Sequence, residues 1–276
     1  MSPTSPQQPA LLARLSFNQM TADPWSLEEA VRQCVKNRVP HIAPWRHKLG
    51  DVRQAATLIR NAGLQVSSLC RGGWFSAPTP DERRQRIADN RRAIEQAAIL
   101  GTPVLVLVNG PAHGQTLDDA RATVLDGIAE VIPDAEKAGV TLGIEPLHPM
   151  YAADRSVVVT LKQANDMAKQ LESSVAGVVI DAFHVWWDPE VYTEIERARG
   201  RIAGFHVSDW SVPLPGILMG RSMMGDGVIE LRRLRTAVEA AGYTGPIEVE
   251  IFNDEIWAAA DDTLIPRIQQ AFLDHV

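Results

Sequence analysis

The sequence has few of the features that mark secreted, membrane-bound or nucleic-acid-binding proteins. Its 276 residues include only two cysteines, in no paired or ligand-like spacing, which is typical of a reducing, cytoplasmic setting. No apolar run approaches the ~20 residues of a membrane helix, so we expect no membrane partner. The net charge of −7 argues against a nucleic-acid partner, whose phosphates would need basic side chains. These absences favour a soluble enzyme.

The start of the chain also lacks a signal-peptide pattern. The segment MSPTSPQQPA is polar and rich in proline, with no basic start followed by a long apolar region. We therefore expect residues 1–10 to form a frayed tail and residues 11–276 to form one catalytic domain. A chain of this length can bury a large core, so folding needs no disulfide and no structural metal.

Short β-rich runs alternate with longer helical patterns along the chain. The runs are mostly continuous rather than alternating in hydrophobicity, as in parallel strands that are buried on both faces. The strands predicted in this way span residues 11–17, 39–45, 64–70, 103–108, 140–145, 175–181, 202–207 and 246–252.

Helix signals lie between these runs. Ser26, Thr79 and Thr160 each precede Glu or Gln by three residues, which is the capping-box pattern of a helix start. Residues 117–138 carry apolar side chains with a 3.6-residue period. Eight strands alternating with about eight helices predict an α/β fold, a single (β/α)8 TIM barrel. A doubly wound open sheet is the alternative, but no glycine-rich phosphate-binding loop follows the first strand.

Ionisable side chains mark the ends of the last four predicted strands, in the order Glu145, Asp181, His206 and Glu250. These strands are neighbours in a barrel, and active sites lie at the C-terminal ends of barrel strands. Three carboxylates so close together need a counter-charge. Their donor set predicts one divalent cation, Mn²⁺ first, with Mg²⁺, Co²⁺ or Zn²⁺ as alternatives. Glu248 lies two residues earlier and is the rival ligand of the last strand.

The segments around these residues resemble the xylose-isomerase-like barrel superfamily. The branch is that of sugar-phosphate isomerases and epimerases, which includes ketose 3-epimerases and inosose isomerases. The most specific segments are GIEPLHP, VVIDAFHVWWD, FHVSDW, GRSMMGDGVIEL and GYTGPIEVEIF. The resemblance implies the same four metal ligands. It also implies that His184 contacts the substrate and that Arg221 binds a substrate oxygen.

One segment departs from this resemblance. Many members carry an acidic residue near the end of the second strand, where this chain has Pro44, Trp45 and Arg46. Arg46 either binds an anionic or hydroxyl-rich part of the substrate or is a solvated loop arginine.

The expected chemistry is that of a metal-dependent carbohydrate isomerase or epimerase. A cation bound beside a ketose or keto-polyol carbonyl acidifies the neighbouring C–H by stabilising an enediolate. Glu145 and Glu250 are the expected acid and base, acting from two faces of the substrate. A lyase or dehydratase acting on a keto-sugar or keto-glycoside through the same site is the alternative.

Aromatic and histidine side chains fall on the expected active-site side of the barrel. We expect Trp45 and Trp186 to contact substrate, as part of an apolar rim, although tryptophans at these positions also pack loops together. The roles of His113 and His148 stay open. No glycine-rich loop marks a helix N-terminus as a phosphate site, so a phosphorylated substrate is not favoured.

Two functions of other classes are less favoured. An abasic-site endonuclease of the related barrel type would need more histidines than the seven present and a basic face for DNA. A non-catalytic binding barrel would not need an intact ligand set. The expected partner is thus a small carbohydrate. A homo-oligomer is compatible with the sequence.

Overall fold

The computed structural model describes residues 7–276. Helix α1 (Gln7–Leu12) occupies the end of the expected tail and the start of the first expected strand, so the first strand begins only at Leu15. The helix forms because Leu11 and Leu12 pack against the core and Pro9 lies in its first turn, where a missing N–H is tolerated. The rest of the expected tail, residues 1–6, lies outside the described residues.

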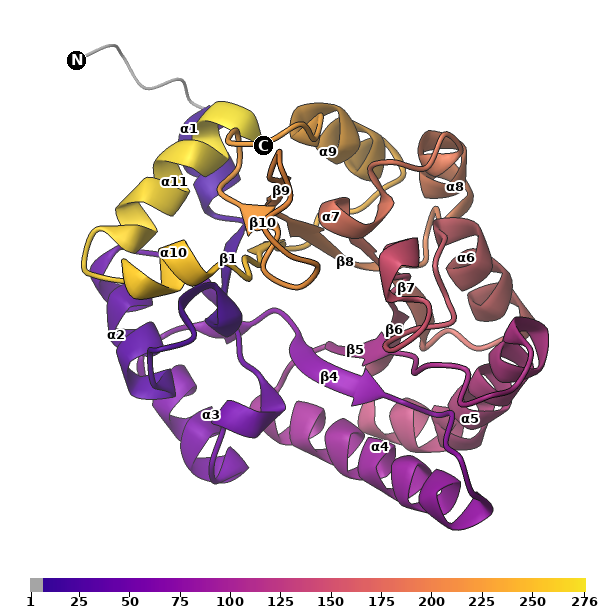
Figure 1. Ribbon diagram of the computed structural model, residues 1–276. Coiled ribbons are helices and arrows are strands. Elements are labelled where there is room, and N and C mark those ends of the chain that lie inside the picture. The colour runs from indigo at the N-terminus through magenta and orange to yellow at the C-terminus, as the bar shows by residue number, and fades with distance from the viewer. Residues whose placement is uncertain (1–6) are drawn as a thin grey trace.

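The predicted barrel is confirmed (Figure 1). Parallel strands follow one another around the sheet, and the third predicted strand is divided into β3 and β4, of which β3 pairs with β2 and β4 with β5. A parallel bridge between Trp45, which follows β2, and Cys70 of the edge strand β4 brings the two ends of the sheet together. The barrel strands are β1 (Leu15–Asn18), β2 (His41–Ala43), β3 (Gln65–Val66), β4 (Leu69–Gly73), β5 (Val104–Val108), β6 (Thr141–Ile144), β7 (Ala176–Asp181), β8 (Ile202–Val207) and β11 (Ile247–Val249).

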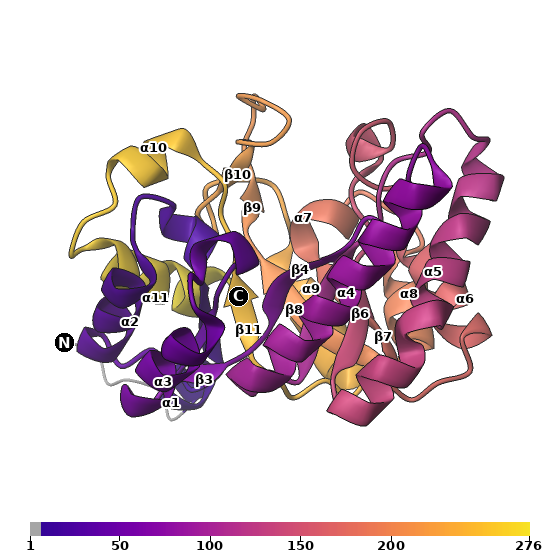
Figure 2. The same ribbon diagram turned by 90° about the horizontal axis from the view of Figure 1, so that it is seen from below.

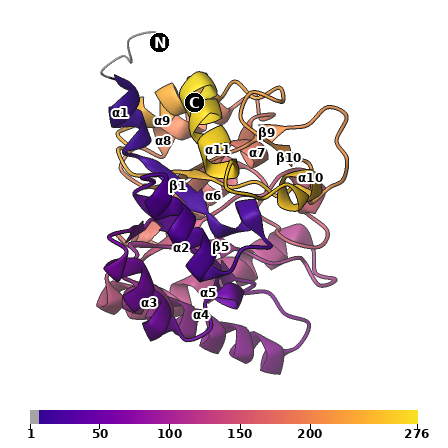
Figure 3. The same ribbon diagram turned by 90° about the vertical axis from the view of Figure 1, so that its left-hand side faces the viewer.

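Eight of the described helices surround the sheet (Figures 1 and 3). The predicted helix starts are confirmed, because the hydroxyls of Ser26, Thr79 and Thr160 each accept a hydrogen bond from the backbone N–H three residues later. Gly101 and Gly139 end two helices in the left-handed conformation. The eight helices are α2 (Leu27–Lys36), α3 (Val52–Asn61), α4 (Pro80–Leu100), α5 (Leu117–Ala138), α6 (Leu161–Gln170), α8 (Val191–Arg197), α9 (Leu231–Ala240) and α11 (Leu264–His275).

The C-terminal ends of the strands carry extra elements that build the barrel mouth (Figure 2). They include the one-turn helix α7 (Ala182–Val185), the hairpin of β9 (Asp209–Trp210) and β10 (Arg221–Ser222), and α10 (Asp254–Ala258). The core below is apolar and close to fully buried, so the mouth rests on a rigid base. None of the described helices has the length and apolar character that crossing a bilayer requires.

Candidate metal centre and substrate cavity

The four side chains predicted at the strand ends converge. Glu145, Asp181, His206 and Glu250 each offer one possible ligand atom, and these atoms lie within 4.8 Å of one another. All four residues are buried. The register explains the convergence, because Asp181 pairs with His206 across β7 and β8, and the two glutamates directly follow β6 and β11.

Polar atoms without partners indicate that this cluster fits a cation. Glu145 Oε1 and both ring nitrogens of His206 are buried and accept or donate no hydrogen bond. Native proteins rarely leave such groups unsatisfied. Oxygen and imidazole donors at this spacing are those that divalent Mn, Mg, Co or Zn accepts. The residues present therefore fit a divalent metal ion.

Burial sets the protonation of the cluster. Burial raises the pKa of Glu145 to about 7, and the charge of the nearby His206 ring only partly opposes that rise. Burial works against a charged His206, but the carboxylates of Glu248, Glu145 and Glu250 raise the pKa of this imidazole well above its usual value. Without a cation, Glu145 and His206 thus tend to bind protons. A bound cation would supply that positive charge in their place.

Glu248, the rival ligand, lies behind the cluster and outside it. Its Oε2 is 3.6 Å from His206 Nε2, whereas His206 Nδ1 is 3.5 Å from Glu145 and 3.7 Å from Glu250. Asn18 donates to Glu248 Oε1 at 2.6 Å and to Glu250 Oε1 at 3.1 Å. His206 Nε2 therefore faces Glu248, whereas His206 Nδ1 faces Glu145 and Glu250 of the cluster.

Arg221 lies against the cluster. Its Nη2 donates to Asp181 Oδ2 at 2.7 Å and lies 3.3 Å from Glu250 Oε2. Although burial opposes it, the charge of Arg221 lowers the pKa of Asp181, so that carboxylate is ionised. Stacking of the guanidinium on the Phe183 ring, at 4.6 Å, and a hydrogen bond to Ser208 fix its position.

His184 lies beside Arg221, with its Nε2 3.2 Å from Arg221 Nη2. The backbone N–H of His148 donates to His184 Nδ1 at 3.2 Å, so a neutral ring carries its proton on Nε2. Burial lowers the pKa of His184 to about 3, which keeps the ring neutral near pH 7. The side chain therefore presents one N–H donor on the side of the cluster.

A cavity of about 390 Å³ opens above the cluster, within the size range of small-molecule sites. Of the four cluster residues, Glu145 and Glu250 line it, and so do His184 and Arg221. Apolar side chains form much of the remaining wall. They are Trp45, Trp74, Val108, Leu147, Tyr151, Leu218 and Phe252.

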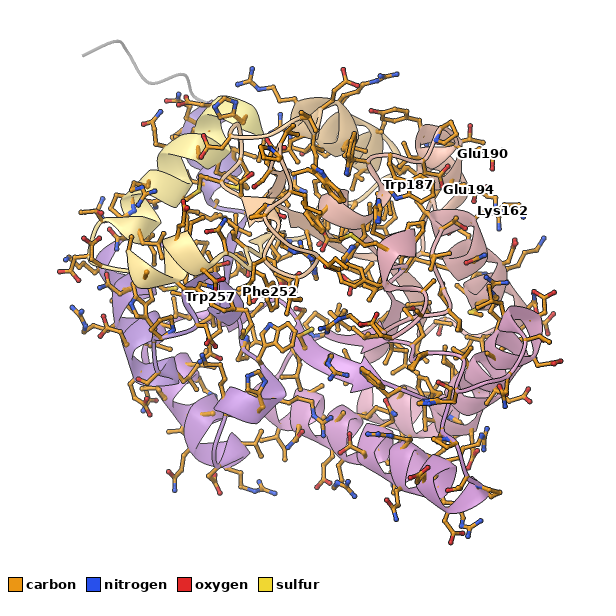
Figure 4. The ribbon with its side chains drawn as sticks, in the orientation of Figure 1. Lys162, Trp187, Glu190, Glu194, Phe252 and Trp257 are labelled. Atoms are coloured by element: carbon orange, nitrogen blue, oxygen red, sulfur yellow. The ribbon has the colours of Figure 1, made fainter. Side chains whose placement is uncertain are left out.

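The structure separates the two tryptophans that were expected to contact substrate. Trp45 lines the cavity, and its ring meets Phe252 edge-on at 5.7 Å. Trp186 is not among the lining residues and packs against Trp210 at 5.5 Å. Figure 4 shows Phe252 beside Trp257 near α10, with Trp187 on the far side of the mouth near α8. Among the tryptophans of the described chain, Trp45 and Trp74 are therefore the two that line the cavity.

Three residues whose roles the sequence left open have defined surroundings. Arg46 lines the cavity but forms a bidentate pair with Asp89, at 2.9 and 3.0 Å, and donates to Gln96. Its charge is satisfied within the protein. His148 packs between Trp187 and Trp210, whereas His113 is exposed in the loop after β5.

Sequence reasoning missed several residues of the site. Asn18 ends β1, so its position marks it in the same way as the acidic residues, whereas Arg71 lies in the middle of β4. Arg86 comes from α4 and Arg155 from the loop after β6, and no motif in the sequence marks them. Phe252 follows β11 and lines the cavity two residues after Glu250.

Comparison with known proteins now identifies the family. The family model described as the xylose isomerase-like TIM barrel matches residues 26–273. The chain belongs to this family.

Individual relatives agree with that assignment. The crystal structure of a protein from Sinorhizobium meliloti 1021 is 44% identical, with a TM-score of 0.93, covering 96% of this chain and 98% of that chain. L-ribulose-5-phosphate 3-epimerase from Salmonella typhi is 25% identical over 202 residues, 71% of this chain and 68% of its own length. The zinc-bound structure of the IOLI protein is 20% identical, with a TM-score of 0.84, covering 95% of this chain and 98% of that chain, and shows the shared fold.

Proposed function

We propose that the protein is a divalent-metal-dependent carbohydrate isomerase or epimerase that acts on a ketose or keto-polyol through an enediolate. One observation carries the proposal. Within the cluster of four possible metal ligands, Glu145 and Glu250 also line the cavity, whereas Asp181 and His206 lie beneath it. Glu145 and Glu250 can then reach a substrate in the cavity, and the same two side chains can bind the cation together with Asp181 and His206. The Salmonella typhi relative is a sugar-phosphate epimerase by name, which supports the same class.

Each residue then has a distinct role. Asp181 and His206 hold the cation, which when bound supplies Lewis-acid stabilisation of charge that develops on substrate oxygens. Of Glu145 and Glu250, one carboxylate removes a proton from a substrate carbon, and the other, in its protonated form, delivers a proton to the opposite face, which inverts the stereocentre. His184 Nε2–H and the Arg221 guanidinium donate hydrogen bonds to the substrate oxygen beside that carbon.

Mn²⁺ is the cation we propose, because three carboxylates and one imidazole form a mostly hard, oxygen-rich donor set. Zinc is the main competitor, since the IOLI protein of the same fold was solved with a zinc atom. Metal analysis of the purified protein, followed by reconstitution with each cation, distinguishes the two.

Proton NMR in D₂O tests the reaction class. A panel of free ketoses, ketose phosphates and inososes is incubated with the metal-loaded protein. We expect deuterium to enter at the carbon next to the carbonyl, with a new stereoisomer and no loss of water. Glu145→Gln and Glu250→Gln should each slow epimer formation by roughly a hundredfold or more, because one face loses its acid or base. Release of water or an aglycone as the main product would contradict the proposal and assign a lyase.

A further inference from the structure

The outer wall of the cavity is formed by arginines that have no acidic partner. Arg71, Arg86 and Arg155 all line it. Within the described part of the chain, no carboxylate oxygen lies within 4.0 Å of a guanidinium nitrogen of any of the three. Asp89, the one carboxylate that lines the cavity outside the metal-ligand cluster, is already shared between Arg46 and Arg92.

Aromatic rings place these guanidinium groups close together. The Arg71 and Arg86 groups lie 4.9 and 5.9 Å from the centre of the Trp74 ring. Arg155 lies 5.7 Å from the Tyr151 ring, and Tyr151 meets His184 edge-on at 5.6 Å. The arginines thus continue the cavity wall outward from the residues proposed to bind the sugar carbonyl.

Aromatic packing leaves the N–H donors of these guanidinium groups open, because in the described part of the chain none of them donates to a protein acceptor and none is a buried unpaired atom. A ring face satisfies part of the charge of a guanidinium but none of its five N–H donors. Burial, together with the charges of Arg155, Arg46 and Arg86, lowers the pKa of Arg71, so the three positive charges disfavour one another. Such a group is stabilised when an anion enters between the donors.

We propose that Arg71, Arg86 and Arg155 bind an anionic group at the end of the substrate remote from the metal centre. This inference rests on the proposed function and names its substrate class. The substrate is a keto-sugar that carries a carboxylate or a phosphate ester. Side chains provide the recognition, so the missing glycine-rich loop, which argued against a phosphorylated substrate, does not exclude one.

Binding measurements with three probes of one carbon skeleton test the proposal. D-fructose, D-fructose 6-phosphate and D-fructuronate are titrated calorimetrically into the metal-loaded protein. We expect at least one anionic probe to bind roughly tenfold or more tightly than D-fructose, as charged hydrogen bonds allow. Preference for the phosphate or for the carboxylate identifies which anion the natural substrate carries. Equal or weaker binding of both anionic probes would overturn the proposal.

Charge-removing variants assign the effect to the arginines. Arg86→Gln and Arg155→Gln should each reduce the ratio of anionic to neutral probe affinity by roughly tenfold. Arg84→Gln is the matched control, because Arg84 lies on the same helix but is exposed and pairs with Asp81. Its ratio should stay within twofold of that of the unmodified protein. A ratio that is unchanged in Arg86→Gln and Arg155→Gln, with melting temperatures preserved, would contradict the proposal.

Deuterium exchange in the same samples separates the two proposals. If no probe exchanges deuterium but the arginine variants still lose anion preference, the proposed reaction fails and the anion site stands. If neutral and anionic probes exchange deuterium equally, and the arginine variants change neither the exchange nor the affinity ratio, the anion site fails and the proposed reaction stands.

Discussion

The two walls of the cavity are built in opposite ways. The inner wall is the metal-ligand cluster, in which Glu145 and Glu250 line the cavity and Asp181 and His206 lie beneath them. Neighbouring strands hold these side chains, and all four are buried. The outer wall uses long arginines that come from β4, from α4 and from the loop after β6, and these side chains are half-buried or exposed. One wall suits a cation and the other an anion.

The difference reflects how much precision each ligand requires. Metal ligation needs donor atoms placed within tenths of an ångström, which neighbouring parallel strands provide because their register is fixed by hydrogen bonds. An anion is held by delocalised guanidinium groups, whose reach tolerates variation in the backbone. Substitutions in the inner wall should therefore have larger effects than those in the outer wall.

Loss of a strand-borne ligand should have the largest effect. His206→Ala and Asp181→Ala should each reduce divalent-metal affinity by roughly a hundredfold or more, because ligand number and charge both fall. Elemental analysis and calorimetric metal titration measure the effect. His113→Asn is the control, since His113 is an exposed histidine with positive φ that asparagine tolerates. Unchanged metal content in both alanine variants would refute the metal centre.

Removing charge behind the imidazole should have a smaller effect. Glu248→Gln leaves the four cluster residues in place but removes the negative charge 3.6 Å from His206 Nε2. Partners of metal-binding histidines typically contribute 10- to 100-fold, so we expect a loss of roughly that size in metal affinity. A loss as severe as that of Asp181→Ala would instead show that Glu248 binds the cation itself.

Proton competition should make metal binding depend on pH. Glu145, with its pKa raised to about 7, and His206, with its pKa raised by neighbouring carboxylates, both hold protons that a cation must displace. Metal affinity should therefore rise with pH between about pH 5 and pH 7, by roughly tenfold or more per pH unit. Glu145→Gln should flatten that slope by removing one displaced proton. A slope of zero would contradict proton displacement.

The inner wall could be predicted from the sequence, because parallel strands place their last residues at one end of a barrel. Glu145, Asp181, His206 and Glu250 followed from that rule alone. The barrel itself followed from the alternation of apolar runs and capped helices. Local pattern was misleading at residues 11 and 12, where two leucines read as strand but pack in a helix.

The outer wall could not be predicted, because its residues share no period and no motif. Arg86 reaches the cavity from a helix, and Arg155 from a loop, through contacts that only the folded chain creates. The tryptophans show the same limit. Trp45 and Trp186 both follow strands, yet the β9–β10 hairpin places Trp210 against Trp186 and leaves Trp45 at the cavity. Loop packing, rather than position along the chain, decides which of them reaches a substrate.

The smallest expected effect distinguishes these two tryptophans. Trp45→Phe removes the indole N–H that donates to Asn18 Oδ1 at 2.9 Å and part of the cavity wall, so we expect KM to rise by a few-fold. Trp186→Phe alters packing against Trp210 and should lower the melting temperature with a smaller change in KM. Steady-state kinetics and thermal melts of both variants provide the test. A larger rise in KM for Trp186→Phe would mean that the substrate extends beyond the Trp45 side of the mouth, across α7.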